Sequence, residues 1–139
     1  MTLQVSLLEQ SFSHILPQKE AFAEAFYDRL FEQFPQVKPL FMNTDMKHQQ
    51  NKLLGALAMV VSNLQHPEKL VEPLKELGRQ HESYYVRPEH YAMVGATLVE
   101  TLARFDPLWT LDLQTAWVGA YETIVEQMSV GPSLKGFSQ

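Results

Sequence analysis

The sequence contains no cysteine, so it forms no disulfide bonds, thiolate metal sites or thioether links to a cofactor. This composition fits a reducing compartment, and we expect a cytoplasmic protein. Basic residues are also few, because 11 Lys and Arg stand against 16 Asp and Glu, which gives a formal net charge of -5. Since they form no run, we expect no basic face and no nucleic-acid partner.

Long hydrophobic runs are missing as well. No stretch approaches the roughly 18 apolar residues of a membrane span, and residues 1–18 lack the basic start and apolar core of a signal peptide. Hydrophobic residues still make up 45% of the 139 residues, which suits one domain with one core. We expect that domain at residues 1–130, followed by a flexible tail at residues 131–139.

Apolar residues recur at spacings of three and four, which is the period of a helix. Nothing alternates with a period of two over a useful length, so the sequence predicts an all-α chain of six longer helices. We expect these helices at residues 3–15, 19–34, 46–64, 68–81, 88–105 and 110–128. Residues 36–41 should form only a turn or a few helical residues, because Pro39 lies among them. The irregular helix lengths favour steep crossings around a central object.

One histidine continues an apolar stripe near the end of the fourth expected helix. Leu70, Leu74 and Leu77 share one helical face, and His81 follows Leu77 by four residues. An imidazole is costly to bury unless its nitrogens find partners. A metal ion and a backbone carbonyl are both suitable partners, and this motif alone favours a core histidine bonded to a backbone carbonyl.

Three further side chains stand out at inner positions. Tyr27 places a polar tip on the inner side of the second helix, and Gln49 extends the inner face of the third. Phe41 lies between them, just after a proline, where an aromatic ring could wedge against a flat ligand. Each has an ordinary explanation, such as a tyrosine hydroxyl that reaches water. Together with His81, they indicate a ligand pocket.

Six stretches carry a resemblance to a known family: FYDRLF (26–31), KPLF (38–41), QQNKL (49–53), LGRQH (77–81), HYAMVG (90–95) and AWVGAY (116–121). In their order and separations, the chain resembles the globin family, specifically its bacterial single-domain and flavohaemoglobin-like branch. The resemblance covers about residues 3–130. It implies a globin fold, with helices packed around a non-covalent haem b.

The resemblance also implies residue roles. His81 would be the proximal ligand of the haem iron, and its other nitrogen would donate to the carbonyl of Leu77. Tyr27 and Gln49 would be the distal pair that donates hydrogen bonds to bound dioxygen and slows its release. The remaining residues implied to contact haem, by packing or through a propionate, are Phe41, Lys52, Leu53, Val86, Tyr91 and Val94.

Two departures from the flavohaemoglobin pattern affect the expected chemistry. In that branch a reductase carrying flavin and nicotinamide sites follows the globin, whereas this chain stops at Gln139, so we expect electrons from a separate reductase. Tyr91 matches a tyrosine that contacts the proximal histidine there, although a core tyrosine is an equal explanation. Pro132 stands where the accompanying glutamate would fall, and Glu126 comes too early. A strong proximal electron push is therefore in doubt.

His48 offers an alternative to Gln49 at the distal site. A register shift of one residue would bring its imidazole over the iron and give a six-coordinate haem. The apolar stripe argues against this, because one residue rotates a helical position by about 100 degrees. We expect the other histidines, His14, His66 and His90, at the surface or at helix caps.

Two function classes share this pocket. The first is reversible binding of dioxygen, and of nitric oxide and carbon monoxide, for storage, delivery or sensing. The second is a nitric oxide dioxygenase, which turns nitric oxide into nitrate and depends on re-reduction by a separate reductase. A haem-free helical interaction module is a third class, which the histidine motif disfavours. The sequence leaves the choice between a monomer and a homodimer open.

Overall fold

The computed structural model describes residues 4–83 and 88–128, without the side chains of residues 81–83 and 88. These residues form six α-helices, three 3-10 helices and no strand, which confirms the predicted all-α class. The α-helices are α1 (Val5–Ile15), α2 (Lys19–Gln33), α3 (Met46–Ser62), α4 (Val71–Ser83), α5 (Pro88–Phe105) and α6 (Leu111–Met128). The 3-10 helices are η1 (Leu16–Gln18), η2 (Pro35–Phe41) and η3 (Pro67–Leu70).

Capping side chains account for two helix starts. The carboxylate of Asp45 accepts a hydrogen bond from the backbone N–H of Lys47 at 3.1 Å and begins α3. The hydroxyl of Thr110 accepts one from the N–H of Leu113, also at 3.1 Å, and begins α6. Both caps satisfy N–H groups that a helix leaves without a partner in its first turn.

Several helix ends differ from the predicted ones by one or two residues, and two differences are larger. The segment expected as a turn or a few helical residues at 36–41 is a 3-10 helix of 7 residues, with Pro39 inside it. Helix α4 begins at Val71 rather than at residue 68, because η3 takes up residues 67–70 as a separate tight turn after His66. The apolar stripe runs through both segments, so periodicity alone does not separate them.

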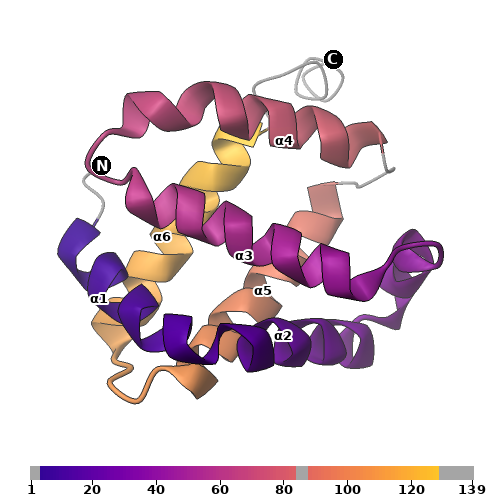
Figure 1. The fold of residues 1–139 in the computed structure, drawn as a ribbon, viewed down its shortest axis with the longest axis horizontal. Coiled ribbons are helices and arrows are strands. Elements are labelled where there is room, and N and C mark those ends of the chain that lie inside the picture. Colours follow the sequence, from indigo (N-terminus) through magenta and orange to yellow (C-terminus); the bar gives the residue numbers. More distant parts are fainter. Residues whose placement is uncertain (1–3, 84–87, 129–139) are drawn as a thin grey trace.

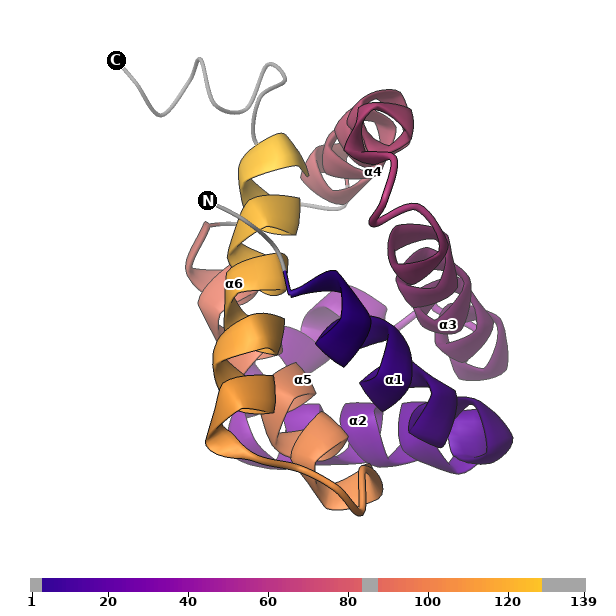
Figure 2. The ribbon, with the colours of Figure 1, turned by 90° about the vertical axis from the view of Figure 1, so that its left-hand side faces the viewer.

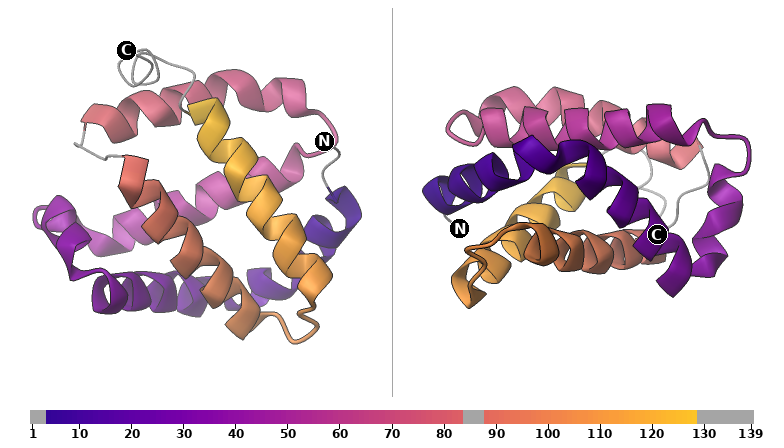
Figure 3. Two further views of the ribbon diagram at one scale, coloured as in Figure 1. Left: turned by 180° about the vertical axis from the view of Figure 1, so that it is seen from behind. Right: turned by 60° about the horizontal axis from the view of Figure 1, so that its bottom comes forward.

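Helices α5 and α6 lie side by side and cross α2 and α3 at steep angles (Figures 1 and 3). Helix α2 packs against both α3 and α5, and α1 packs against α6 and α3. Helix α4 has a different main partner, since it packs chiefly against α6. The consecutive helices α3 and α4 therefore pack mainly against different helices, α2 and α6. Figure 2 shows α3 and α4 on the same side of the molecule.

The core lies where α1, α2, α5 and α6 meet. Its fully buried large side chains include Leu8, Ile15, Phe22, Phe26, Leu30 and Leu102. The rings of Phe22 and Phe105 meet edge to face, with centroids 5.7 Å apart, and fix α2 against the end of α5. Helices α3, η2 and α4 pack against this core through Leu57, Val37 and Leu74. None of the described helices is long and apolar enough to cross a membrane.

Candidate functional site

The structure joins Tyr27 and Gln49, the two polar residues predicted on inner helix faces. The side-chain amide of Gln49 on α3 donates a hydrogen bond to the Tyr27 hydroxyl oxygen on α2, over 3.1 Å. Tyr27 is buried and Gln49 is half-buried. The bond links two helices through residues 22 positions apart in the sequence.

Aromatic rings surround Tyr27 and fix its position. The ring of Phe26 meets the tyrosine edge to face at 4.8 Å, and the ring of Phe41 meets it at 5.8 Å. Phe31 lies 5.3 Å from Phe41 and completes the cluster. Phe41, at the end of η2, therefore lies beside Tyr27.

Burial raises the pKa of Tyr27 to about 12, and the hydrogen bond from Gln49 lowers it only in part. The phenol is therefore neutral at physiological pH. Because its oxygen accepts the bond from Gln49, its own proton is available for a bound ligand. A neutral donor at the edge of an apolar cluster suits a small ligand that accepts hydrogen bonds.

The inner stripes of three helices lose their burial at one end. Three helices each pair a buried residue with a half-buried one a turn away: Leu57 and Leu53 on α3, Leu74 and Leu77 on α4, and Leu98 and Val94 on α5. Figure 1 shows the N-terminal ends of α3 and α5 and the C-terminal end of α4 on the same side of the molecule. Apolar side chains that point inward yet remain half-exposed fit a flat, apolar group between α3 and α4.

A family model described as Globin matches residues 24–128. The chain belongs to the globin family. It is 32% identical over 104 residues to a flavohemoprotein from Vibrio cholerae, a match that covers 73% of this chain and 26% of that protein. The globin chain thus spans about a quarter of the length of the curated relatives it matches.

Solved structures share the fold. A bacterial globin from Campylobacter jejuni superposes with a TM-score of 0.81 at 23% identity, covering 96% of this chain and 97% of that one. An engineered carbene transferase, made from a Rhodothermus marinus protein proposed to be a nitric oxide dioxygenase, gives 0.83 at 22% identity, covering 96% and 94%. These likenesses support the globin fold predicted from the sequence.

The other residues predicted to contact haem are Lys52, Tyr91, His81 and Val86. Lys52 on α3 is exposed, and Tyr91 on α5 is half-buried. The backbone of His81 lies in α4, but its side chain is outside the described residues, as is the whole of Val86. Their predicted contacts with haem therefore stay predictions. Glu126 is exposed on α6, and Pro132 is outside the described residues.

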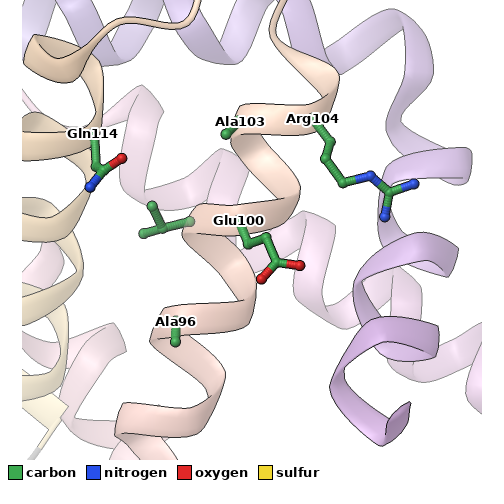
Figure 4. A pocket seen from close by; sticks show the side chains of 6 residues that line it. Ala96, Glu100, Ala103, Arg104 and Gln114 are labelled. Atoms are coloured by element: carbon green, nitrogen blue, oxygen red, sulfur yellow. The ribbon is translucent and has the colours of Figure 1, made fainter. Parts of the chain in front are cut away.

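Two grooves among the described residues lie away from Tyr27 and Gln49. One, of about 470 Å³, is lined by side chains of α5 and by Gln114 of α6, and Figure 4 shows Glu100 and Arg104 along it. A second, of about 620 Å³, lies between Tyr91 and Tyr121 on the same two helices. Neither includes α3 or α4, so neither is the site indicated by Tyr27 and Gln49.

A buried polar junction between α1 and the end of α5 was not predicted from the sequence; it consists of Ser11, His14, Asp106 and Trp117. The Ser11 hydroxyl donates to Asp106 at 2.6 Å and accepts from the indole N–H of Trp117 at 3.0 Å. Nδ1 of His14 lies 2.8 Å from the other oxygen of Asp106. The expectation that His14 lies at the surface or at a cap is wrong, because it is half-buried against this carboxylate.

Burial of the Asp106 carboxylate favours the protonated form, but its hydrogen bonds outweigh this effect. Ser11, the backbone N–H of Leu108 and His14 together hold the pKa of Asp106 below its usual value. These polar atoms bond to one another, so the junction stabilises the fold.

Proposed function

We propose that this globin binds a non-covalent haem b between α3 and α4 and takes up dioxygen reversibly, with nitric oxide and carbon monoxide as further ligands. The haem would supply the iron at which a gas binds. The observation that supports the proposal is the hydrogen bond from Gln49 to a buried, neutral Tyr27. Among the described residues, no three carboxylate or imidazole groups gather to hold a metal ion by themselves.

The distal pair would favour dioxygen over carbon monoxide. Dioxygen in this site accepts hydrogen bonds strongly, whereas carbon monoxide accepts them weakly. Tyr27 can donate its hydroxyl proton while Gln49 holds its oxygen, and the second amide hydrogen of Gln49 is a further donor. Two such donors would each contribute roughly 1–2 kcal/mol. Together they would raise the dioxygen affinity on the order of a hundredfold, mainly through slower release.

The remaining residues would position the haem. His81 would provide the proximal nitrogen from α4, while Phe41 and Leu53 would pack on the distal side. Val86, Tyr91 and Val94 would pack on the proximal side, Leu77 would orient His81 through its carbonyl, and Lys52 would reach a propionate from the exposed side of α3. Five of these residues are partly buried hydrophobic side chains, which supports such packing: Phe41, Leu53, Leu77, Tyr91 and Val94.

The visible absorption spectrum of the purified full chain tests the proposal. We expect a broad five-coordinate ferrous spectrum without gas that converts to a stable dioxygen complex in air. The absence of any haem spectrum, after expression with sufficient haem, would contradict the proposal as a whole. A sharp six-coordinate ferrous spectrum would contradict an open distal site and point to an internal ligand such as His48.

Nitric oxide dioxygenase activity is the second candidate, favoured by the flavohemoprotein relatives. In that case Tyr27 and Gln49 would hold dioxygen while nitric oxide enters the site, and a separate flavin reductase would restore the ferrous state. Nitrate should form in proportion to nitric oxide consumed when a reductase and its nicotinamide donor are added. Slow reduction of the ferric form under these conditions, with a long-lived dioxygen complex, would favour plain dioxygen binding.

A further inference from the structure

Gly78 on α4 is in backbone contact with the last residue of α6. A Cβ atom added at Gly78 would meet the carbonyl oxygen of Met128 at 2.0 Å and its carbonyl carbon at 2.8 Å. Both are backbone atoms, so no rotamer change relieves the clash. Ordinary contact begins at about 3.4 Å, so any larger residue would force the two helices apart at this point.

A second glycine fixes α6 against α5. A Cβ at Gly95 would meet the ring of Tyr121 at 2.6 Å, and the Tyr121 hydroxyl donates to the backbone carbonyl of Tyr91 at 2.6 Å. Helix α6 is therefore held firmly on α5, while its C-terminal turn touches α4. Because α6 is the main partner of α4 within the described part of the chain, this turn determines where α4 lies.

We propose that the contact between Gly78 and the C-terminal turn of α6 sets the position of His81 relative to the haem, so that Gly78 is a positioning residue for the proximal bond. This inference rests on the proposed function, in which His81 is the proximal ligand. Gly78 lies three residues before His81, less than one helical turn away. A displacement of α4 at Gly78 is therefore carried directly to the histidine.

The test is Gly78→Ala in the full chain, measured by resonance Raman spectroscopy of the ferrous protein without gas. We expect the iron–histidine stretching band to shift, and the rate of carbon monoxide binding to change with it, since a misplacement of about 1 Å can alter a rate by up to ~100-fold. The matched control is Gly55→Ala on α3, where an added Cβ meets nothing within 4 Å. This control should leave the band in place, with the free energy of unfolding equal or raised.

The outcomes separate the two proposals. A wild-type chain that binds no haem overturns both. A haem-loaded Gly78→Ala protein that is less stable but keeps the band of the wild type overturns this inference alone, because a purely structural glycine would behave in that way. If Gly78→Ala does not fold, Met128→Gly decides the matter, because glycine gives the opposing turn the backbone freedom to move its carbonyl away from Gly78. Met128→Ala is its control, since it removes the same buried side chain without that freedom. A band shifted further in Met128→Gly than in Met128→Ala supports the positioning role, and equal bands overturn it.

Discussion

Replacement of Tyr27 by phenylalanine removes one hydroxyl and leaves the surrounding packing in place. The ring keeps its edge-to-face contacts with Phe26 at 4.8 Å and with Phe41 at 5.8 Å. The amide of Gln49 loses its acceptor, but Gln49 is half-buried and can turn to water. We therefore expect Tyr27→Phe to fold normally and to bind haem as the wild type does.

The effect on dioxygen follows from the lost donor. A hydrogen bond of this kind contributes about 1–2 kcal/mol, which corresponds to roughly 5- to 30-fold faster release of dioxygen. Release of carbon monoxide should change much less, because carbon monoxide accepts hydrogen bonds weakly. The ratio of the two effects distinguishes a lost donor from a general loosening of the site.

The assay is stopped-flow displacement of dioxygen by carbon monoxide, for the wild type, Tyr27→Phe, Gln49→Leu and the double variant. Since Gln49 donates to Tyr27, the two single effects should not add, and the coupling should amount to about 0.5–3 kcal/mol. An unchanged dioxygen release rate in Tyr27→Phe would refute the assigned role. Equal changes for dioxygen and carbon monoxide would refute the hydrogen-bond argument.

Three further predictions concern other groups. Between pH 10 and about 12, the unfolded chain ionises Tyr27 while the folded chain keeps it neutral. The free energy of unfolding should therefore fall as pH rises, by on the order of 2–3 kcal/mol. Urea titrations of Tyr27→Phe should show a smaller fall over the same pH range. Asp106→Asn should lower the free energy of unfolding by about 1–3 kcal/mol, whereas Asp28→Asn, at an exposed position of α2, should leave it nearly unchanged. His48 is exposed, so His48→Ala should leave the ferrous spectrum as it is, and a change from six- to five-coordinate absorption would identify His48 as an internal ligand.

Tyr27 and Gln49 could each be picked out from the sequence because each interrupts an otherwise apolar helical face, and the resemblance to globins implied that they act as a pair. A polar side chain at such a position needs a polar partner, and the partner is most easily another interruption of the same kind. The structure confirms that the two side chains meet. The helices themselves could be predicted for the same reason, since their periodicity is local.

The junction of Ser11 with Asp106 could not be predicted as a pair, because 95 residues separate the two and no local pattern connects them. A signal for Ser11 was nevertheless present. It lies three residues after Leu8 and four before Ile15, on the face that both bury. Ser11 therefore interrupts an apolar helical face as Gln49 does, which predicts its burial, although only the fold identifies its partner.

The buried junction also has a consequence for the order of events during synthesis. Helix α1 precedes the region matched by the family model, yet the indole N–H of Trp117 and the carboxylate of Asp106 both depend on Ser11. A nascent chain makes its N-terminal residues first, so α1 leaves the ribosome long before α6 exists. Its hydrogen bonds can form only when nearly the whole domain has been made. Docking of α1 onto α5 and α6 is therefore a late step of folding during synthesis, and until then the apolar face of α1 lacks its partners.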